Sequence, residues 1–129
     1  MRLNPDCIRD ILLYCENVCV PDNGAEFDYQ SVFTYDNRKY SGEELYYHLR
    51  QCNLNGFFVN AEDYFLVSEY YVADISPKAH EFLANIRKDT IWQKTKDTAS
   101  KIGASSLSVL CQIASSVVSE IIKSHIIGH

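Results

Sequence analysis

Apolar residues recur at helical spacing in several segments of the chain, and polar capping residues mark where these segments begin. Near the N-terminus, Asn4 and Pro5 form a typical helix start. An apolar stripe follows at three- and four-residue spacing, which predicts one buried helix face. The stripe consists of Ile8, Ile11, Leu12 and Cys15.

The next segments change from strand-like to helical patterns. Residues 27–40 are rich in aromatic and β-forming side chains with a turn signal at Asp36-Asn37, which predicts a short strand or a hairpin and no second helix. Ser41 and Glu44 then have the spacing of a capping box. The helix that they open is expected to end at Asn55-Gly56.

A two-stranded ribbon is predicted after this helix. Residues 57–59 and 64–75 have strand character, and the polar run of residues 60–63 is interpreted as the tip between them. Ser76-Pro77 then caps a helix that turns Ala79, Phe82, Leu83 and Ile86 inward.

Two further helices are expected. Asp89 can cap the first, which stops at Gly103, and the second runs from Ser105 or Ser106 toward Ile127. We therefore predict an α+β domain over residues 1–87, with a small antiparallel sheet, and a C-terminal helical extension over residues 88–129.

Two segments resemble the winged helix-turn-helix fold. The run from His48 to Phe57, with His-Leu followed by a Gly and an apolar residue, is similar to the third helix and turn of winged-helix regulators. The run from Ile75 to Leu83 is similar to the junction that closes their wing. The resemblance implies a winged-helix-like domain, a fold that most often binds DNA.

A second resemblance covers nearly the whole chain. Residues 3–12, Tyr47-His48-Leu49, residues 80–87 and residues 89–96 resemble an uncharacterised, prophage-associated family of small proteins, the domain of unknown function 2513. This resemblance implies a phage or prophage setting. It brings no activity and no functional residues with it.

Charge is distributed unevenly along the chain, whose net charge is −5. Residues 1–75 contain 5 Lys and Arg against 13 Asp and Glu, whereas residues 76–129 contain 7 against 4. All nine tyrosines lie between Tyr14 and Tyr71. The predicted winged part is therefore acidic and rich in tyrosine.

DNA binding is one interpretation of this pattern. The exposed face of the predicted third helix and the residues just before it offer groups that can contact bases or phosphates: Arg38, Lys39, Tyr47, Arg50 and Gln51. However, Glu43 and Glu44 stand at the helix start, and Glu62 and Asp63 at the expected wing tip. Since phosphate contacts require cations, charge disfavours DNA as the ligand.

Protein binding is the favoured interpretation. Tyrosine buries a large area at small entropic cost, and an acidic surface suits a basic or mixed partner, such as a host or phage protein. Some of these rings are expected to fill the core instead, about half of them by the size of the domain. The tyrosines concerned are Tyr29, Tyr35, Tyr40, Tyr46, Tyr47, Tyr70 and Tyr71.

The last helix allows three interpretations. Its apolar stripe packs on its own domain, pairs with the same stripe of a second copy to make a homodimer, or lies on a membrane surface. The dimer interpretation assigns the interface to Leu107, Leu110, Ala114, Val117 and Ile121.

Nothing in the chain predicts catalysis, a cofactor or a metal site. The sequence has no phosphate-binding glycine loop and no nucleophile motif, and His48 is interpreted as a hydrogen-bonded core residue. Cys15 and Cys19 are one helical turn apart without a second ligand pair, so the five cysteines are expected to be reduced thiols. With no signal-peptide run and no stretch judged long and uncharged enough to span a bilayer, a cytoplasmic location is expected.

Overall fold

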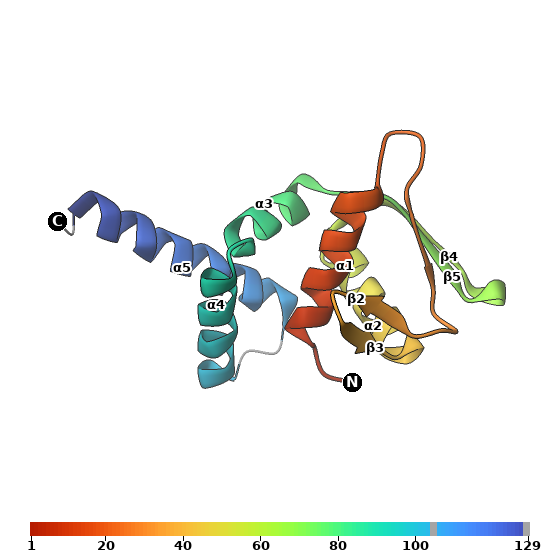
Figure 1. The fold of residues 1–129 in the computed structure, drawn as a ribbon, viewed down its shortest axis with the longest axis horizontal. Helices are drawn as coiled ribbons and strands as arrows, with labels where there is room; N and C mark the ends of the chain where they lie inside the picture. The colour runs from red at the N-terminus through yellow and green to blue at the C-terminus, as the bar shows by residue number, and fades with distance from the viewer. Residues whose placement is uncertain (104–105, 128–129) are drawn as a thin grey trace. The chain divides into compact units, whose positions relative to one another are not determined.

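The computed structural model describes residues 1–103 and 106–127 as a mixed α+β fold (Figure 1). The chain divides into two compact units, residues 1–80 and 81–129. This division falls inside helix α3 (Pro77–Ile86), whereas the sequence analysis placed a boundary after residue 87.

Helix α1 (Pro5–Val18) begins where the capping residues predicted. The Asn4 side chain accepts a hydrogen bond from the Asp6 amide at 3.1 Å, and Pro5 stands in the first turn, where no amide hydrogen is needed. The predicted apolar stripe is completely buried, which stabilises the fold by about 1.5–3 kcal/mol for each Ile or Leu.

Strands β2 (Phe33–Tyr35) and β3 (Arg38–Tyr40) form the hairpin that the aromatic segment predicted. Asp36 and Asn37 make its turn with φ of 48° and 68°. Asp and Asn tolerate this left-handed region better than other residues with side chains, and two-residue hairpins require it.

An aromatic cluster connects this hairpin to the rest of the first unit. The Phe33 ring lies 5.9 Å from the Tyr14 ring of α1 and 5.7 Å from the Phe27 ring, measured between centroids. Phe27 belongs to strand β1 (Ala25–Asp28). The hairpin is thus held by edge-to-face ring contacts, which add to the burial of apolar area.

Helix α2 (Gly42–Leu54) has the predicted N-cap and end, but the Glu44 carboxylate, which would complete a capping box, accepts a hydrogen bond from the Asn4 side chain instead. The Ser41 hydroxyl oxygen accepts a hydrogen bond from the Glu44 amide at 3.1 Å. After the helix, Gly56 has a φ of 76°, which residues with a Cβ rarely adopt. The inner face of α2 is buried and consists of Leu45, His48, Leu49 and Cys52.

The main sheet is antiparallel, with the strand order β1-β5-β4. Strands β4 (Phe58–Tyr64) and β5 (Glu69–Ile75) form a hairpin, and β1 pairs with the other edge of β5. A second, two-stranded sheet consists of β2 and β3.

The tip of the β4–β5 hairpin differs from the prediction. The polar run of residues 60–63 lies inside β4, and the chain turns instead through a single 3₁₀ turn at Phe65–Val67, followed by Ser68 in the left-handed region. The physical reason is cross-strand packing: Glu62 lies opposite Tyr71 and Asp63 opposite Tyr70. Tyrosine partners hold acidic residues in a strand although these residues have low strand propensity.

Helix α3 (Pro77–Ile86) begins at the predicted cap. The Ser76 hydroxyl accepts a hydrogen bond from the Ala79 amide at 3.2 Å and donates one to the Gly56 carbonyl at 2.6 Å. Its predicted inner face is buried, as expected, and consists of Ala79, Phe82, Leu83 and Ile86.

The second unit contains helices α4 (Asp89–Ile102) and α5 (Leu107–Ile127). Lys88, without a side-chain capping bond, precedes α4, so the prediction that Asp89 is the cap was wrong by one residue; Asp89 instead supplies negative charge to the first turn. Gly103, with φ of 70°, ends α4 as predicted. The Ser106 hydroxyl accepts a hydrogen bond from the Val109 amide at 3.2 Å, and the alternative start at Ser105 lies outside the described residues.

Candidate functional site

The solvent face of the main sheet carries two cross-strand rows of acidic and tyrosine side chains. Glu26, Tyr71 and Glu62 are directly paired across the three strands, and Asp28, Glu69 and Tyr64 form the adjacent row. Since side chains two residues apart share one face of a strand, all six lie on the same face. We call these six residues the acidic sheet face.

The acidic sheet face lacks cations. Strands β1, β4 and β5 contain Glu26, Asp28, Glu62, Asp63, Glu69 and Asp74 and no Lys or Arg. The four carboxylates of the face are exposed, and Tyr71 is half-buried. A hollow of about 380 Å³ lies on this side, lined by Glu26, Glu62, Tyr64, Glu69, Tyr70 and Tyr71.

Hydrogen bonds fix the two tyrosines of the face. The Tyr64 hydroxyl donates to Glu62 at 2.6 Å, and this bond raises the pKa of Tyr64 above its ordinary value. The Tyr71 hydroxyl accepts a hydrogen bond from the Gly24 amide at 3.1 Å. Gly24 itself passes so close to the Val72 carbonyl that a Cβ would collide with it. Both rings of the face are therefore oriented by hydrogen bonds within the chain.

A second group of tyrosines is centred on Asp63. The hydroxyls of Tyr29 and Tyr46 donate to its two carboxylate oxygens, both at 2.7 Å, and the two rings lie 4.3 Å apart between centroids. Hydrogen bonding to Asp63 raises the pKa of Tyr46, and desolvation followed by the same kind of bond raises the pKa of Tyr29. Asp63 is thus exposed but bonded to two tyrosines of the same chain, and it does not form the predicted wing tip.

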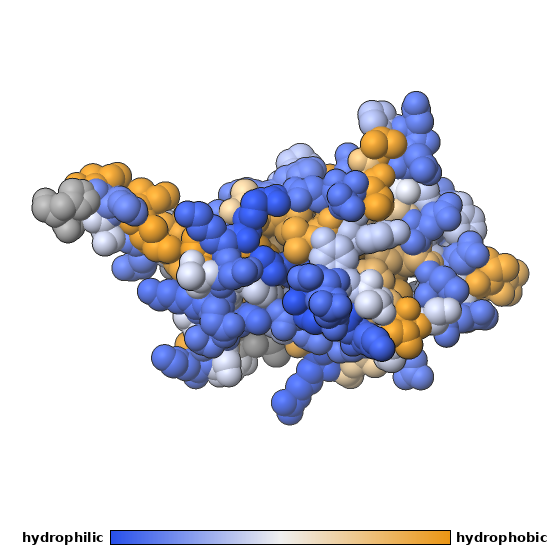
Figure 2. Space-filling view, in the orientation of Figure 1, coloured by the Kyte–Doolittle hydropathy of each residue, from blue (hydrophilic) through white to orange (hydrophobic). Residues whose placement is uncertain are grey.

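The hairpin tip beside the acidic sheet face is apolar. Phe65, Leu66 and Val67 are 69%, 96% and 58% exposed, and in Figure 2 the end of the β4–β5 hairpin is a hydrophobic patch next to hydrophilic surface. The sequence pattern predicts a strand for these residues instead. The signal that could have identified the tip is the three-residue apolar run between Tyr64 and Ser68, which breaks the alternation of the flanking segments.

Fewer tyrosines are buried than the sequence analysis expected. Tyr40 and Tyr70 are buried, whereas the other seven are half-buried or exposed. This surplus of accessible rings is the composition that protein contact surfaces share.

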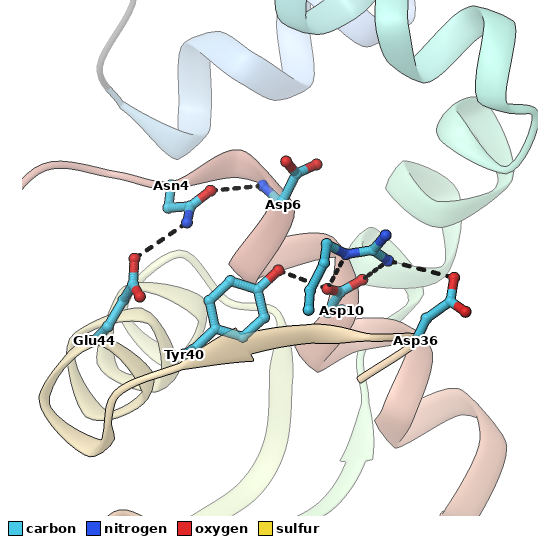
Figure 3. A network of polar contacts seen from close by, with 7 residues as sticks. Asn4, Asp6, Asp10, Asp36, Tyr40 and Glu44 are labelled. Atoms are coloured by element: carbon cyan, nitrogen blue, oxygen red, sulfur yellow. Dashed lines mark hydrogen bonds and ion pairs between the residues drawn. The ribbon is translucent and has the colours of Figure 1, made fainter. Parts of the chain in front are cut away.

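Arg38, one of the predicted DNA-binding residues, has an internal partner. Its guanidinium forms a bidentate pair with Asp10, at 2.7 and 2.8 Å, and the Tyr40 hydroxyl donates to the same carboxylate at 2.6 Å (Figure 3). Asp10 has no solvent exposure. Sequence reasoning missed this network because Asp10 lies in a helix and Arg38 in a distant hairpin.

The other predicted DNA-binding residues lie in β3 and α2. Lys39 and Arg50 are exposed, and Tyr47 and Gln51 are half-buried. The Arg50 guanidinium lies 6.0 Å from the centre of the Tyr46 ring, and Tyr47 packs edge-on against His48. With Arg38 paired to Asp10, the remaining cations of this group are Lys39 and Arg50.

His48 is the buried, hydrogen-bonded core residue that the sequence analysis expected. Its Nε2 accepts a hydrogen bond from the Asn4 amide at 2.7 Å, and its Nδ1 lies 2.7 Å from the Glu44 carbonyl, to which it donates. Burial lowers the pKa of His48 below its ordinary value. The Asn4 side chain also donates to Glu44 at 3.1 Å (Figure 3), so this group ties α1 to α2.

The cysteines have the environment of packed thiols. All five are free, and Cys7, Cys15 and Cys52 are buried. Burial raises the pKa of Cys7 and Cys15 well above the ordinary range, which keeps them protonated. Within the described part of the chain, no group of three His, Cys, Asp or Glu side chains is placed to hold a metal ion.

The predicted dimer residues of α5 are mostly covered within the chain. Four of the five have at most 5% exposure (Leu107, Leu110, Ala114 and Val117), and Ile121 is half-buried. Among the described large apolar side chains of α5, Ile122 and Ile126 are exposed, at 52% and 74%. A contact between copies through α5 would therefore use a different face from the one predicted.

Helix α5 has the length and the apolar composition of a membrane-spanning helix, which the sequence pattern was not expected to contain. Among the described residues it is the helix whose stretch Leu107–Ile126, 20 residues, is long and apolar enough to cross a membrane. The judgement that no stretch is long and uncharged enough was thus too strict. Length and composition alone are also satisfied by core helices, so the absence of a membrane span stays a prediction.

Comparisons with known proteins bear on kinship. A family model described as "Hypothetical protein (DUF2513)" matches residues 2–105. An uncharacterized protein of Haemophilus influenzae is 29% identical over 131 residues, which cover 95% of this chain and 99% of that protein. No solved structure matches the chain. The match confirms the resemblance to the domain of unknown function 2513, and since it spans most of the chain, the protein belongs to the DUF2513 family of hypothetical proteins.

Proposed function

We propose that this protein acts by binding another protein, and not by catalysis, with the acidic sheet face and its apolar tip as the contact surface. The partner is a host or phage protein that presents an apolar pocket bordered by Lys and Arg. The main support for this proposal is the pair of cross-strand rows. In these rows, four exposed carboxylates and two hydrogen-bonded tyrosines share one face without a cation.

The carboxylates and the rings have different tasks in this proposal. Exposed carboxylates raise the association rate with a basic partner through long-range attraction, which salt weakens. Tyr64 and Tyr71, whose hydroxyls already have hydrogen-bond partners, lose little entropy when they are covered. The face therefore combines steering with a pre-organised contact area.

The tip supplies the apolar anchor. A side chain as exposed as Leu66, at 96%, gains nearly its full transfer free energy when a partner covers it, about 1.5–3 kcal/mol. Glu62 and Glu69 lie directly behind the tip, and they repel phosphate groups of nucleic acids and of anionic lipids. A basic-rimmed protein pocket fits both features, whereas a phosphate surface is disfavoured by the two carboxylates.

The winged-helix relationship is part of the same proposal. In support, the element order is helix, strand, hairpin, helix and a two-stranded ribbon, and the ribbon pairs with the first strand in the order β1-β5-β4. Hairpin β2–β3 stands where a winged helix-turn-helix domain has its second helix. Such a scaffold, with an acidic sheet and an apolar tip, is suited to a protein ligand.

DNA binding through α2 is the alternative. Its support is the same topology, together with exposed Lys39 and Arg50 and half-buried Tyr47 and Gln51. Against it, residues 1–80 carry thirteen Asp and Glu and six Lys and Arg, and Arg38 is engaged by Asp10. A duplex-DNA mobility shift at about 20 mM salt that is lost in Arg50→Ala would establish this alternative.

Affinity capture tests the proposal. The chain serves as bait in an extract of its host at about 50 mM salt, beside a Glu26→Lys/Glu69→Lys variant, which reverses two exposed carboxylates of the acidic sheet face. The control, Asp22→Lys/Glu43→Lys, makes the same change in charge at exposed positions outside the face.

The two variants separate a local contact from a general charge effect. We expect a specific set of proteins to bind the wild type and the control, and to be lost from the sheet variant because its steering charge is reversed. Retention of the same proteins by the sheet variant would refute the assignment of the acidic sheet face. Loss from both variants would show that only net charge matters.

A further inference from the structure

Strand β4 is an open edge of the main sheet. It pairs with β5 on one side, and the order β1-β5-β4 places no strand on its other side. A strand residue directs its backbone N–H and C=O to one side, so some residues of β4 direct theirs away from the sheet. Within residues 1–103 and 106–127, no hydrogen bond joins the backbone of β4 to an element other than β5.

The other neighbour of β5 shows how its backbone groups are directed. The Tyr29 amide donates to the Ser68 carbonyl at 3.0 Å, just beyond the pairing of β1 with β5. Since every second residue of an antiparallel ladder bonds to the same neighbour, the backbone groups of Tyr70 and Val72 are also directed toward β1. In agreement, the Val72 carbonyl oxygen lies next to Gly24, which precedes β1.

Two residues of β4 therefore face the open edge with their backbone. Ala61 lies opposite Val72, and Asp63 lies opposite Tyr70. Because Val72 and Tyr70 bond toward β1, Ala61 and Asp63 have their own N–H and C=O groups turned away from the sheet. Asn60, with a φ of 51°, interrupts the ladder, so this alternation begins after it. The open edge thus offers donors and acceptors at the two-residue spacing that an added strand needs.

Charge decides which strand can add to this edge. Glu62 stands between Ala61 and Asp63 and is exposed on the acidic sheet face. If two copies of β4 paired antiparallel through both Ala61 and Asp63, their Glu62 side chains would lie directly opposite each other, which is destabilising. A strand of another protein with Lys or Arg at this position forms an opposite-charge pair instead. The edge therefore disfavours a second copy and favours a basic segment.

We propose that an extended segment of the partner protein, with Lys or Arg at every second position, adds to β4 as a further strand of the main sheet. The basic side chains then lie beside the acidic sheet face, and the backbone of the segment bonds to Ala61 and Asp63. This inference rests on the proposed function, and it specifies that the basic border of the partner's pocket is bound through its backbone.

Two synthetic peptides of about eight residues with blocked ends test the proposal. Both contain equal numbers of Lys and Thr, in strict alternation in one peptide and in two blocks in the other. Titration of the isotope-labelled full chain at about 20 mM salt is followed by nuclear magnetic resonance. We expect the alternating peptide to bind about tenfold more tightly, because only this peptide places all its lysines on one face of a strand.

Amide exchange locates the contact on the chain. In the complex with the alternating peptide, exchange of the Ala61 and Asp63 amides should slow about tenfold or more, because an added strand occupies these donors. The Glu62 and Tyr64 amides are directed toward β5 and should change less. Rapid exchange of Ala61 and Asp63 in the saturated complex overturns the proposal.

Methylation of the peptide backbone separates strand addition from attraction of charges. One version of the alternating peptide is N-methylated at every Thr and the other at every Lys, and both keep the full charge. Since only alternate amides of an added strand point to its neighbour, one version should bind about tenfold more weakly than the other. Loss in the Thr version indicates antiparallel addition, and loss in the Lys version indicates parallel addition. Equal binding by the two versions contradicts the proposal.

A pair of charge variants tests the position of the basic side chains. Glu62→Lys should weaken binding of the alternating peptide about tenfold, whereas Glu43→Lys, the same change at an exposed position of α2, should have an effect of about twofold or less. Equal weakening by both variants would show that only net charge matters, which overturns the proposal. Circular dichroism checks that both variants are folded.

The outcomes distinguish this inference from the proposed function. If Glu26→Lys/Glu69→Lys loses the captured proteins but the alternating peptide does not bind, the acidic sheet face is a contact surface and strand addition is wrong. If that variant retains the captured proteins, the proposed function fails whether or not the peptide binds. Slow exchange of Ala61 and Asp63 in the free chain that is lost on dilution would show a second copy at the edge, which also overturns the inference.

Discussion

Replacing Arg38 by alanine would leave the buried carboxylate of Asp10 with the hydrogen bond from the Tyr40 hydroxyl that Figure 3 shows. Removing one partner of a fully buried ion pair costs about 3–5 kcal/mol, because the other charge stays without compensation. Here the Arg38 side chain is 39% exposed, so water replaces part of the lost contact. We therefore expect a loss of about 2–3 kcal/mol in the free energy of unfolding, a large part of the usual 5–15 kcal/mol.

Urea denaturation at neutral pH, followed by far-ultraviolet circular dichroism, measures this loss. The midpoint should fall by about 1–2 M relative to the wild type. Lys39→Ala is the control, because Lys39 is the adjacent residue of the same strand and is exposed, so its replacement should change stability by less than about 0.5 kcal/mol. A double-mutant cycle with Asp10→Asn isolates the pairwise contribution.

The result separates two roles of Arg38. If Arg38→Ala is as stable as Lys39→Ala, the bidentate pair contributes nothing measurable and the reasoning from burial is refuted. If the loss is as large as expected, Arg38 has a structural role, and a DNA-binding test should use Arg50, whose exposure lets it change without unfolding the chain.

Three further predictions concern stability. Because burial lowers the pKa of His48, this imidazole takes up a proton in the unfolded chain at a higher pH than in the folded chain. The free energy of unfolding should therefore decrease as the pH falls from about 6.5 to the folded pKa. Urea midpoints of His48→Gln should lack the part of the decrease that His48 causes. Gly24→Ala should cost about 1–3 kcal/mol, seen as a lower thermal midpoint, because the new Cβ meets the backbone of Val72 and Ala73; an unchanged midpoint would show that β5 yields freely. Leu66→Ser should change thermal stability by less than about 0.5 kcal/mol because the side chain is exposed, and a larger loss would mean that the tip has an internal partner.

Local signals in the sequence determined most of the elements. Helix starts at Asn4, Ser41 and Ser76, and helix ends at Gly56 and Gly103, were predicted because caps and left-handed stops act within a few residues. The β2–β3 hairpin followed from Asp36-Asn37 in the same way. These features need no knowledge of distant parts of the chain.

The features that the sequence did not indicate depend on long-range pairing. Glu62 and Asp63 have poor strand propensity, and only their registration against Tyr71 and Tyr70 places them inside β4. As a consequence, the hairpin tip lies later in the chain than predicted, and it is apolar instead of acidic. The buried pair of Asp10 and Arg38 is of the same kind, since 28 residues separate its members.

Part of the candidate site can be predicted from the sequence alone. In each of three strands, two residues of the site are spaced two apart in the sequence, which places both on one face of that strand. These pairs are Glu26 and Asp28, Glu62 and Tyr64, and Glu69 and Tyr71. Only the strand order β1-β5-β4 and its register bring the three pairs together. The predicted residues of α5, in contrast, were correctly identified as an apolar stripe, but a stripe pattern does not say what covers it.

Hydrogen exchange of the chain, free and bound to the protein that it captures, tests the central claim most directly. Our account predicts slower exchange at the tip, residues 65–68, and along the edge strand β4, with little change in α2. Protection centred on α2 around Tyr47, Arg50 and Gln51, with the tip and β4 unchanged, would contradict it.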